Sequence, residues 1–123
     1  MISYVTVGTN DFDAAERFFD ALLSELGASQ MMKSERMIFW ARGDGSPGLA
    51  LAKPLDGKPA TIGNGSMLSL AADSQEQVDA LYAKALALGG SDEGEPGIRN
   101  QGFYVAYFRD LDGNKFNLFC AAP

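Results

Sequence analysis

The sequence of 123 residues contains no histidine and only one cysteine, Cys120. A single cysteine excludes an intrachain disulfide and every Cys-x-x-Cys metal or redox motif. Without histidine, a serine such as Ser66 or Ser69 lacks the usual base that would activate it as a nucleophile. Because Cys120 ends an apolar strand pattern, we interpret it as a buried, inert thiol rather than a reactive group.

Positive charge is also scarce. Ten Lys and Arg stand against sixteen Asp and Glu, which gives a net charge of −6 and a pI near 4.4. The basic residues are scattered, so no basic stripe predicts a nucleic acid or an anionic membrane as partner. No apolar run approaches transmembrane length, and Met1 leads into a strand pattern rather than a signal peptide. We therefore expect a cytoplasmic protein whose acidic surface is compatible with a cationic ligand.

The chain reads as two similar halves. In the first, the alternating run Ile2–Val7 precedes a segment with helical spacing that Gly27 ends. In the second, Met67–Ala71 precedes a helical segment that Gly89 ends, and Ser74 with Gln77 has the spacing of a capping box. The two helical segments align at an offset of about 62 residues, which indicates an internal repeat.

Three short strands are predicted after each helix. They are Ser29–Lys33, Arg36–Arg42 and Gly48–Lys53 in the first half, and Ser91–Gly94, Phe103–Arg109 and Lys115–Cys120 in the second. The order is βαβββ twice, whereas a ferredoxin-like α+β barrel would have two strands after each helix. We predict an α+β fold with one domain over residues 1–123, made of a module 1–54, a Pro- and Gly-rich linker 55–64 and a module 65–123.

Strand alternation distinguishes the two faces of each sheet. Apolar side chains that should pack on the helices are Val5, Val7, Leu68, Leu70, Phe116 and Leu118. The intervening side chains, which include Tyr4, Met67, Lys115 and Asn117, are mixed in polarity and should line a concave face. One packed face and one mixed face predict a cupped binding site.

Three segments together resemble the vicinal oxygen chelate superfamily, which includes glyoxalase I, extradiol dioxygenases, fosfomycin-resistance enzymes and bleomycin-binding proteins. They are Tyr4–Asp11 before the first helix, Gly63–Leu70 before the second, and the Asp-x-Asp-Gly-Asn turn in Arg109–Lys115. The resemblance covers nearly the whole chain. It implies that the two modules enclose a cup and that the protein is a homodimer.

The resemblance also locates the positions that hold a metal in metal-dependent members. Here they are Tyr4, Met67 and Asn117. A phenol that stays protonated, a thioether and a neutral amide are a poor set for a hard divalent ion. We therefore expect no metal and no cofactor.

Residues from both halves would form the walls of the cup. Trp40, Tyr107 and Arg109 would supply aromatic and cationic groups, and the register of the last turn decides which face Tyr107 occupies. Asp110 and Asp112 are interpreted as turn residues rather than an acid–base pair. The segment Gly94–Gly102 is either a surface loop or a lid that closes Arg99 on a ligand.

These observations favour metal-independent binding of a small molecule, with sequestration of a toxic compound as one version. The predicted ligand-binding residues are Tyr4, Met67, Asn117, Trp40, Tyr107 and Arg109. One alternative is a glyoxalase- or dioxygenase-like enzyme that uses Glu16 or Glu35 as a ligand, or Tyr4 as an acid without metal. The other is a dimerising regulatory module whose cup its own side chains fill.

Overall fold

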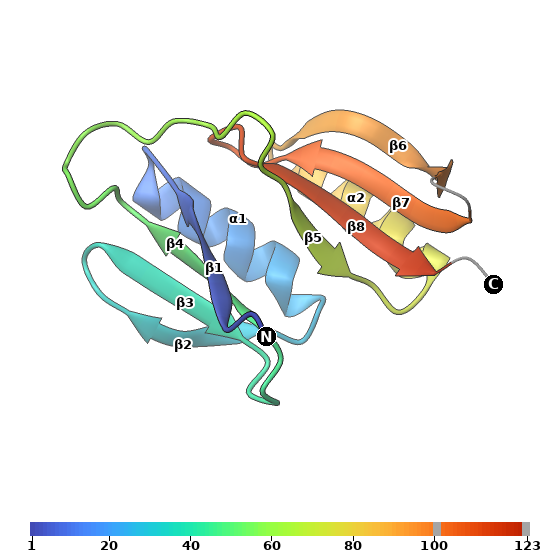
Figure 1. Cartoon of the computed structure of the whole chain (residues 1–123), viewed down its shortest axis with the longest axis horizontal. Helices are drawn as coiled ribbons and strands as arrows, with labels where there is room; N and C mark the ends of the chain where they lie inside the picture. Colours follow the sequence, from blue (N-terminus) through green and yellow to red (C-terminus); the bar gives the residue numbers. More distant parts are fainter. Residues whose placement is uncertain (100–101, 122–123) are drawn as a thin grey trace. The chain divides into compact units, whose positions relative to one another are not determined.

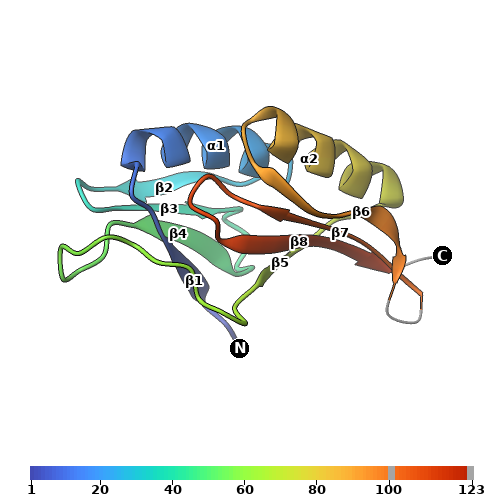
Figure 2. The ribbon, with the colours of Figure 1, turned by 90° about the horizontal axis from the view of Figure 1, so that it is seen from above.

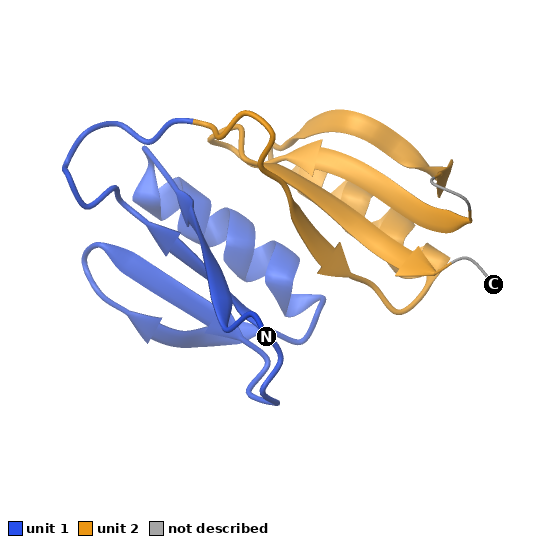
Figure 3. Ribbon diagram, in the orientation of Figure 1, with its two compact units in different colours: residues 1–61 blue, residues 62–123 orange. Residues whose placement is uncertain are grey.

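The structure, a computed structural model, describes residues 1–99 and 102–121. The chain divides into two compact units, Met1–Thr61 and Ile62–Pro123 (Figure 3). In the first unit the elements are β1 (Tyr4–Gly8), α1 (Phe12–Ser24), β2 (Ser29–Lys33), β3 (Met37–Ala41) and β4 (Gly48–Ala52). In the second they are β5 (Leu68–Ala71), α2 (Gln75–Ala87), β6 (Ser91–Arg99), β7 (Phe103–Arg109) and β8 (Lys115–Ala121) (Figure 1).

Each unit holds a mixed four-stranded sheet with one helix along one of its faces (Figure 2). The strand orders are β1-β4-β3-β2 and β5-β8-β7-β6. The first strand of each unit pairs in parallel with the last, and the remaining pairs are antiparallel. Both units are therefore βαβββ modules, which confirms the predicted fold class and excludes the ferredoxin-like alternative.

The helices start at polar caps that the sequence provides. The carboxylate of Asp11 accepts a hydrogen bond from the amide of Ala14 at 3.1 Å, and α1 begins there. The hydroxyl of Ser74 accepts from the amide of Gln77 at 3.0 Å. The Gln77 side chain in turn accepts from the amide of Asp73 at 2.7 Å, which completes a capping-box arrangement one residue before Ser74.

The core of each unit lies between its helix and its sheet. In the first unit, the fully buried Phe19 of α1 lies 5.8 Å from Trp40 of β3, measured between ring centroids. In the second, Phe108 and Phe116 stack at 5.3 Å on adjacent strands, and Leu81 of α2 is buried as well. Burial of each such side chain contributes about 1.5 to 3 kcal/mol to folding.

The boundary between the units follows Thr61, inside the segment 55–64 assigned to the linker. Ala60 of that segment is bound to the first unit, because the Asn10 carboxamide accepts from the amide of Ala60 at 2.7 Å and donates to its carbonyl at 3.0 Å. The organisation as one domain with modules 1–54 and 65–123 stays a prediction.

The segment after residue 94 corrects the sequence interpretation. It was expected to be a loop or lid, but Gly94–Arg99 continues β6 and pairs with β7. Register shifts between Asp92 and Gly94, and between Gly94 and Gly97, show that this strand is bulged. Glycine and proline in an edge strand accommodate such bulges, so their density does not require a loop here. Residues 100 and 101 of the expected lid lie outside the described residues.

No helix within residues 1–99 and 102–121 is long and apolar enough to cross a membrane.

Candidate functional site

In the second unit, tyrosine hydroxyls identify the sheet face that α2 covers. Tyr104 of β7 donates to Asp79 of α2 at 2.6 Å, and Tyr82 of α2 donates to Asp92 of β6 at 2.8 Å. By alternation, Phe108 lies on this helix-covered side and Tyr107 on the opposite, uncovered face. The register that the sequence left open is thus decided.

One row of side chains crosses that uncovered face. Strand pairing brings together Ser69 of β5, Asn117 of β8, Tyr107 of β7 and Gly94 of β6. We call these four residues the Asn117 row. The antiparallel pairing of β7 with β8 places Tyr107 directly opposite Asn117.

Asn117 is the most unusual member of this row. Its side chain is 5% exposed, and its amide oxygen Oδ1 is buried with no hydrogen-bond partner among the described residues. A buried acceptor without a partner costs about 1 to 3 kcal/mol. Such a cost is typical of a site where an external group completes the hydrogen bonding.

The Tyr107 ring lies beside Asn117 with two cations close to it. The guanidinium carbon of Arg99 is 5.6 Å from the ring centroid, and Nζ of Lys115 is 5.5 Å from it. Gly94 leaves room for the ring, because a Cβ at this position would lie 2.9 Å from Tyr107 Cδ2. The row therefore combines an amide, an aromatic ring and positive charge.

Arg109, the last residue of β7, lies on the same face, but its side chain is engaged by Glu93 and by the adjoining turn. Its Nε donates to the Glu93 carboxylate at 2.6 Å and its guanidinium donates to the carbonyl of Gly113 at 2.8 Å. The bond from Arg109 lowers the pKa of Glu93. Arg109 is thus already neutralised, and it braces the β7–β8 turn.

The turn itself is organised by Asp110, which is 5% exposed. Its carboxylate accepts from the amides of Asp112 and Asn114 and from the Asn114 side chain, at 2.8 to 3.0 Å. Burial raises the pKa of Asp110 despite these bonds. Gly113 has φ +89, which suits glycine. The Asp110 contacts agree with the interpretation of Asp110 and Asp112 as turn residues rather than as an acid–base pair.

Met67 stands immediately before β5, and its side chain is 44% exposed. Continued alternation along the strand puts it on the same face as Ser69 and Asn117.

Tyr4 belongs to the first unit, where it contributes to a different aromatic surface. Its ring meets that of Phe39 edge to face, with centroids 5.5 Å apart. Gly48 permits this arrangement, because a Cβ there would lie 2.6 Å from the Phe39 ring. Phe39 was missed by the sequence interpretation, which placed Trp40 on the wall instead.

Trp40 corrects that assignment, because it faces α1. It is 1% exposed, and its indole nitrogen donates to the carboxylate of Asp20 at 2.8 Å. The strand β3 is apolar at every position from Met37 to Ala41, so the sequence offered no polar residue to tell its two faces apart. Trp40 is a core residue of the first unit and is removed from the candidate site.

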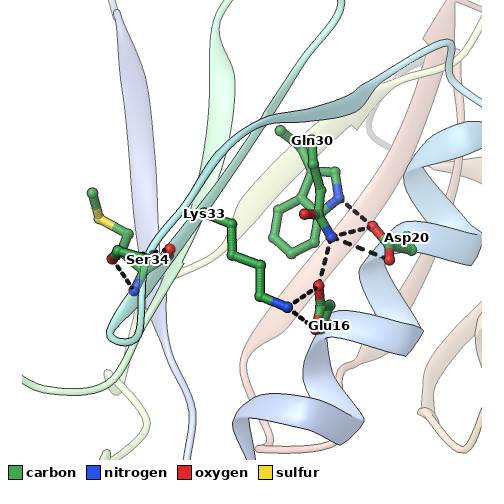
Figure 4. A network of polar contacts seen from close by, with 7 residues as sticks. Glu16, Asp20, Gln30, Lys33 and Ser34 are labelled. Atoms are coloured by element: carbon green, nitrogen blue, oxygen red, sulfur yellow. Dashed lines mark hydrogen bonds and ion pairs between the residues drawn. The ribbon is translucent and has the colours of Figure 1, made fainter.

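A polar network joins α1 to β2 on the helix-covered side (Figure 4). Glu16 accepts from Gln30 at 2.7 Å and from Lys33 at 2.9 Å, and Gln30 also donates to Asp20 at 2.9 Å. The bonds from Gln30 and Lys33 lower the pKa of Glu16. Glu16, one of the proposed alternative metal ligands, is therefore engaged in joining helix to sheet. The other, Glu35, lies in the exposed turn between β2 and β3.

The donor set at the three positions matched to a metal centre does not fit a hard divalent metal. Tyr4, Met67 and Asn117 provide a phenol, a thioether and a neutral amide, with no anionic ligand. Among residues 1–99 and 102–121, no group of three or more His, Cys, Asp or Glu side chains could hold a metal ion. We derive no chemistry through a metal at these positions.

Comparison with known proteins agrees with this architecture. The profile of the Glyoxalase/Bleomycin resistance protein/Dioxygenase superfamily matches residues 1–118. This chain belongs to that superfamily.

Solved structures show the same fold. A glyoxalase/bleomycin resistance protein from Albidiferax ferrireducens is 41% identical, with a TM-score of 0.89 and 97% of each chain covered. A hypothetical protein from S. aureus is 26% identical, with a TM-score of 0.76 and coverage of 98% of this chain and 93% of that one. A lactoylglutathione lyase from Agrobacterium tumefaciens, 23% identical with a TM-score of 0.70, covers 97% and 92% and shows the fold alone. No match was found among curated proteins.

Proposed function

We propose that this protein binds a small molecule at the Asn117 row, without a metal. The observation that carries the proposal is the buried Oδ1 of Asn117, which has no hydrogen-bond partner among the described residues and lies opposite Tyr107 on a face that α2 leaves uncovered. A ligand that donates a hydrogen bond to this oxygen would remove the cost of burying it. Membership in a superfamily named for glyoxalases, bleomycin resistance proteins and dioxygenases supports a small-molecule ligand.

Met67 would extend the site along β5, and Arg109 would hold the turn that positions β8. Tyr4 stays a proposed ligand contact on the aromatic surface of the first unit. Sequestration of a toxic compound in a cytoplasmic homodimer is the specific form of the proposal that the resemblance to bleomycin resistance proteins favours.

The test is Asn117→Ala, studied by ¹⁵N–¹H NMR with a panel of neutral, anionic and cationic aromatic fragments. We expect at least one fragment to perturb the amides of the Asn117 row in the wild type. The variant should bind that fragment about tenfold more weakly, because one buried hydrogen bond is lost. Its free energy of unfolding should change little or rise, since the variant no longer buries an unpartnered oxygen.

Asn64→Ala is the matched control, because it makes the same change at an exposed position in the linker. It should leave the binding unchanged. Treatment with EDTA should also leave the binding unchanged, and elemental mass spectrometry after exposure to manganese, iron, nickel and zinc should detect no stoichiometric metal. Retention of one metal per chain would refute the metal-free proposal. A panel in which no fragment perturbs the row would refute the site.

A further inference from the structure

The charges around the Asn117 row differ in sign from the protein as a whole. The chain carries a net charge of −6, yet two cations flank the Tyr107 ring, Lys115 and Arg99. Among the described residues, neither forms an ion pair with a carboxylate. The neighbouring Arg109, by contrast, is paired with Glu93. The row is thus flanked by two positive charges that no ion pair within the described chain neutralises.

Among the described residues, Arg99 donates hydrogen bonds to backbone carbonyls and not to a carboxylate. Its guanidinium donates to the carbonyl of Val105 at 3.0 Å and to that of Glu95 at 2.7 Å. Guanidinium has five N–H donors, so three stay available after these two bonds. Neutral carbonyls orient the group without cancelling its charge, which makes it a fixed donor for an anion.

Lys115 is half-buried and is the partner of Arg109 across the β7–β8 pair. Its field helps to lower the pKa of Glu93, but the hydrogen bond to the Glu93 carboxylate comes from Arg109. No described group accepts a hydrogen bond from its ammonium. An ammonium can only donate, so a ligand that contacts Lys115 must bring an acceptor, and an anionic acceptor gains most.

Asn117 imposes the opposite requirement. Its buried Oδ1 can only accept hydrogen bonds, and no group in the described part of the chain donates one to it. A ligand that satisfies the whole row therefore carries an anionic oxygen group and, a short distance away, a hydroxyl or N–H. An apolar or aromatic portion would contact the ring of Tyr107, which is half-buried.

From this complementarity we infer that the Asn117 row binds a small organic carboxylate that carries a neighbouring hydrogen-bond donor. The carboxylate contacts Lys115, Arg99 adds a second positive charge at the Tyr107 ring, and the donor contacts Oδ1 of Asn117. This inference rests on the proposed function and narrows its ligand class. It also opposes the cationic ligand that the overall acidic composition suggests.

Three matched probes test the inference by ¹⁵N–¹H NMR titration. Mandelate has a carboxylate and an adjacent hydroxyl, phenylacetate lacks the hydroxyl, and mandelamide keeps the hydroxyl but has no charge. We expect mandelate to perturb the amides of the Asn117 row with a dissociation constant on the order of 1 mM. Phenylacetate should bind about fivefold to tenfold more weakly because Asn117 then lacks its donor, and mandelamide should bind at least about tenfold more weakly.

The variant Lys115→Met tests whether the positive charge of Lys115 binds the carboxylate of the probe. It should weaken mandelate about tenfold and leave mandelamide unchanged, because only the charged probe needs the ammonium. Lys58→Met is the matched control, since it removes the same charge from an exposed position in the linker. It should change neither affinity.

Equal binding of mandelate and mandelamide at the row, or equal effects of the two lysine variants, would overturn the inference. So would the absence of any mandelate perturbation of the row. Neutral or cationic fragments that still bind the row through Asn117 would leave the proposed function standing while refuting the anionic ligand class. Failure of every fragment would refute both.

Discussion

At the scale of single residues, Trp40 and Asn117 show that burial can have opposite effects on stability. Both are buried, at 1% and 5% exposure. Trp40 satisfies its one polar atom with a bond to Asp20, so its burial stabilises the first unit. The oxygen of Asn117 has no partner within residues 1–99 and 102–121, so its burial costs stability and indicates a site.

Trp40→Phe should therefore act on stability alone. We expect the free energy of unfolding to fall by about 1 to 3 kcal/mol, because the variant loses packing against Phe19 and the bond to Asp20. Trp40 is the only tryptophan, so urea-induced unfolding should be followed by circular dichroism rather than fluorescence. Affinity for a fragment bound at the Asn117 row should stay unchanged. A loss of affinity with intact stability would return Trp40 to the binding site.

At the scale of elements, each helix is joined to its sheet by polar contacts as well as by apolar packing. Glu16 of α1 contacts Gln30 and Lys33 of β2, and Tyr82 of α2 contacts Asp92 of β6. The bond to Asp92 raises the pKa of Tyr82 to about 12. These contacts fasten the edge strand of each sheet to the helix.

The Glu16 contact should make stability depend on pH. Because the folded-state pKa of Glu16 is lowered from 4.5, its contribution is present above that value and is lost as pH falls through the lowered pKa. At pH 7, Glu16→Gln should lower the free energy of unfolding by about 0.5 to 1 kcal/mol, because Lys33 is half exposed and water screens the pair. The difference from wild type should shrink in more acidic buffers.

Urea unfolding at a series of pH values measures this effect. Glu35→Gln is the control, because Glu35 lies in an exposed turn with no carboxylate contact to lose. A difference between Glu16→Gln and wild type that stayed constant down to strongly acidic pH would contradict the assignment.

The repeat also reads more clearly at this scale. The helix N-caps, Asp11 and Ser74, are separated by one residue more than the expected offset of about 62. The glycines with positive φ that follow the helices, Gly27 and Gly89, match that offset. Hydrogen-bonded caps, rather than similar residue types, set where each helix starts.

At the scale of the whole molecule, large apolar side chains are exposed at or beside edge strands of the sheets. They include Ile2, Tyr4, Met31, Met32, Met67 and Ile98. Exposed apolar edges are places where proteins associate. This distribution supports the proposed homodimer.

Sedimentation equilibrium should accordingly give a mass twice the 13.1 kDa of one chain at micromolar concentration. Ile2→Glu, at a side chain that is 55% exposed beside β1, should raise the dimer dissociation constant about tenfold. Leu55→Glu, at an 86% exposed position of the linker, should not. A monomeric mass for the wild type would contradict the proposal.

The sequence by itself determined the order of elements, the fold family and the acidic turn between the last two strands. It did so because strand alternation, helix caps and the Asp-x-Asp-Gly-Asn turn act through neighbours in the chain, as the contacts of Ser74 and Asp110 illustrate.

Only the tertiary structure decided which face Trp40 and Tyr107 occupy and which residues pair across the strands. Because β3 is apolar at every position, its sequence did not indicate which face Trp40 occupies. Because β6 is bulged, its sequence did not indicate the strand that places Arg99 beside Tyr107. Pairing register is a property of two strands together, and a shift of one residue exchanges the faces. For this reason the partners of Asn117, and with them the charge of the ligand we infer, emerged only once the strands were paired.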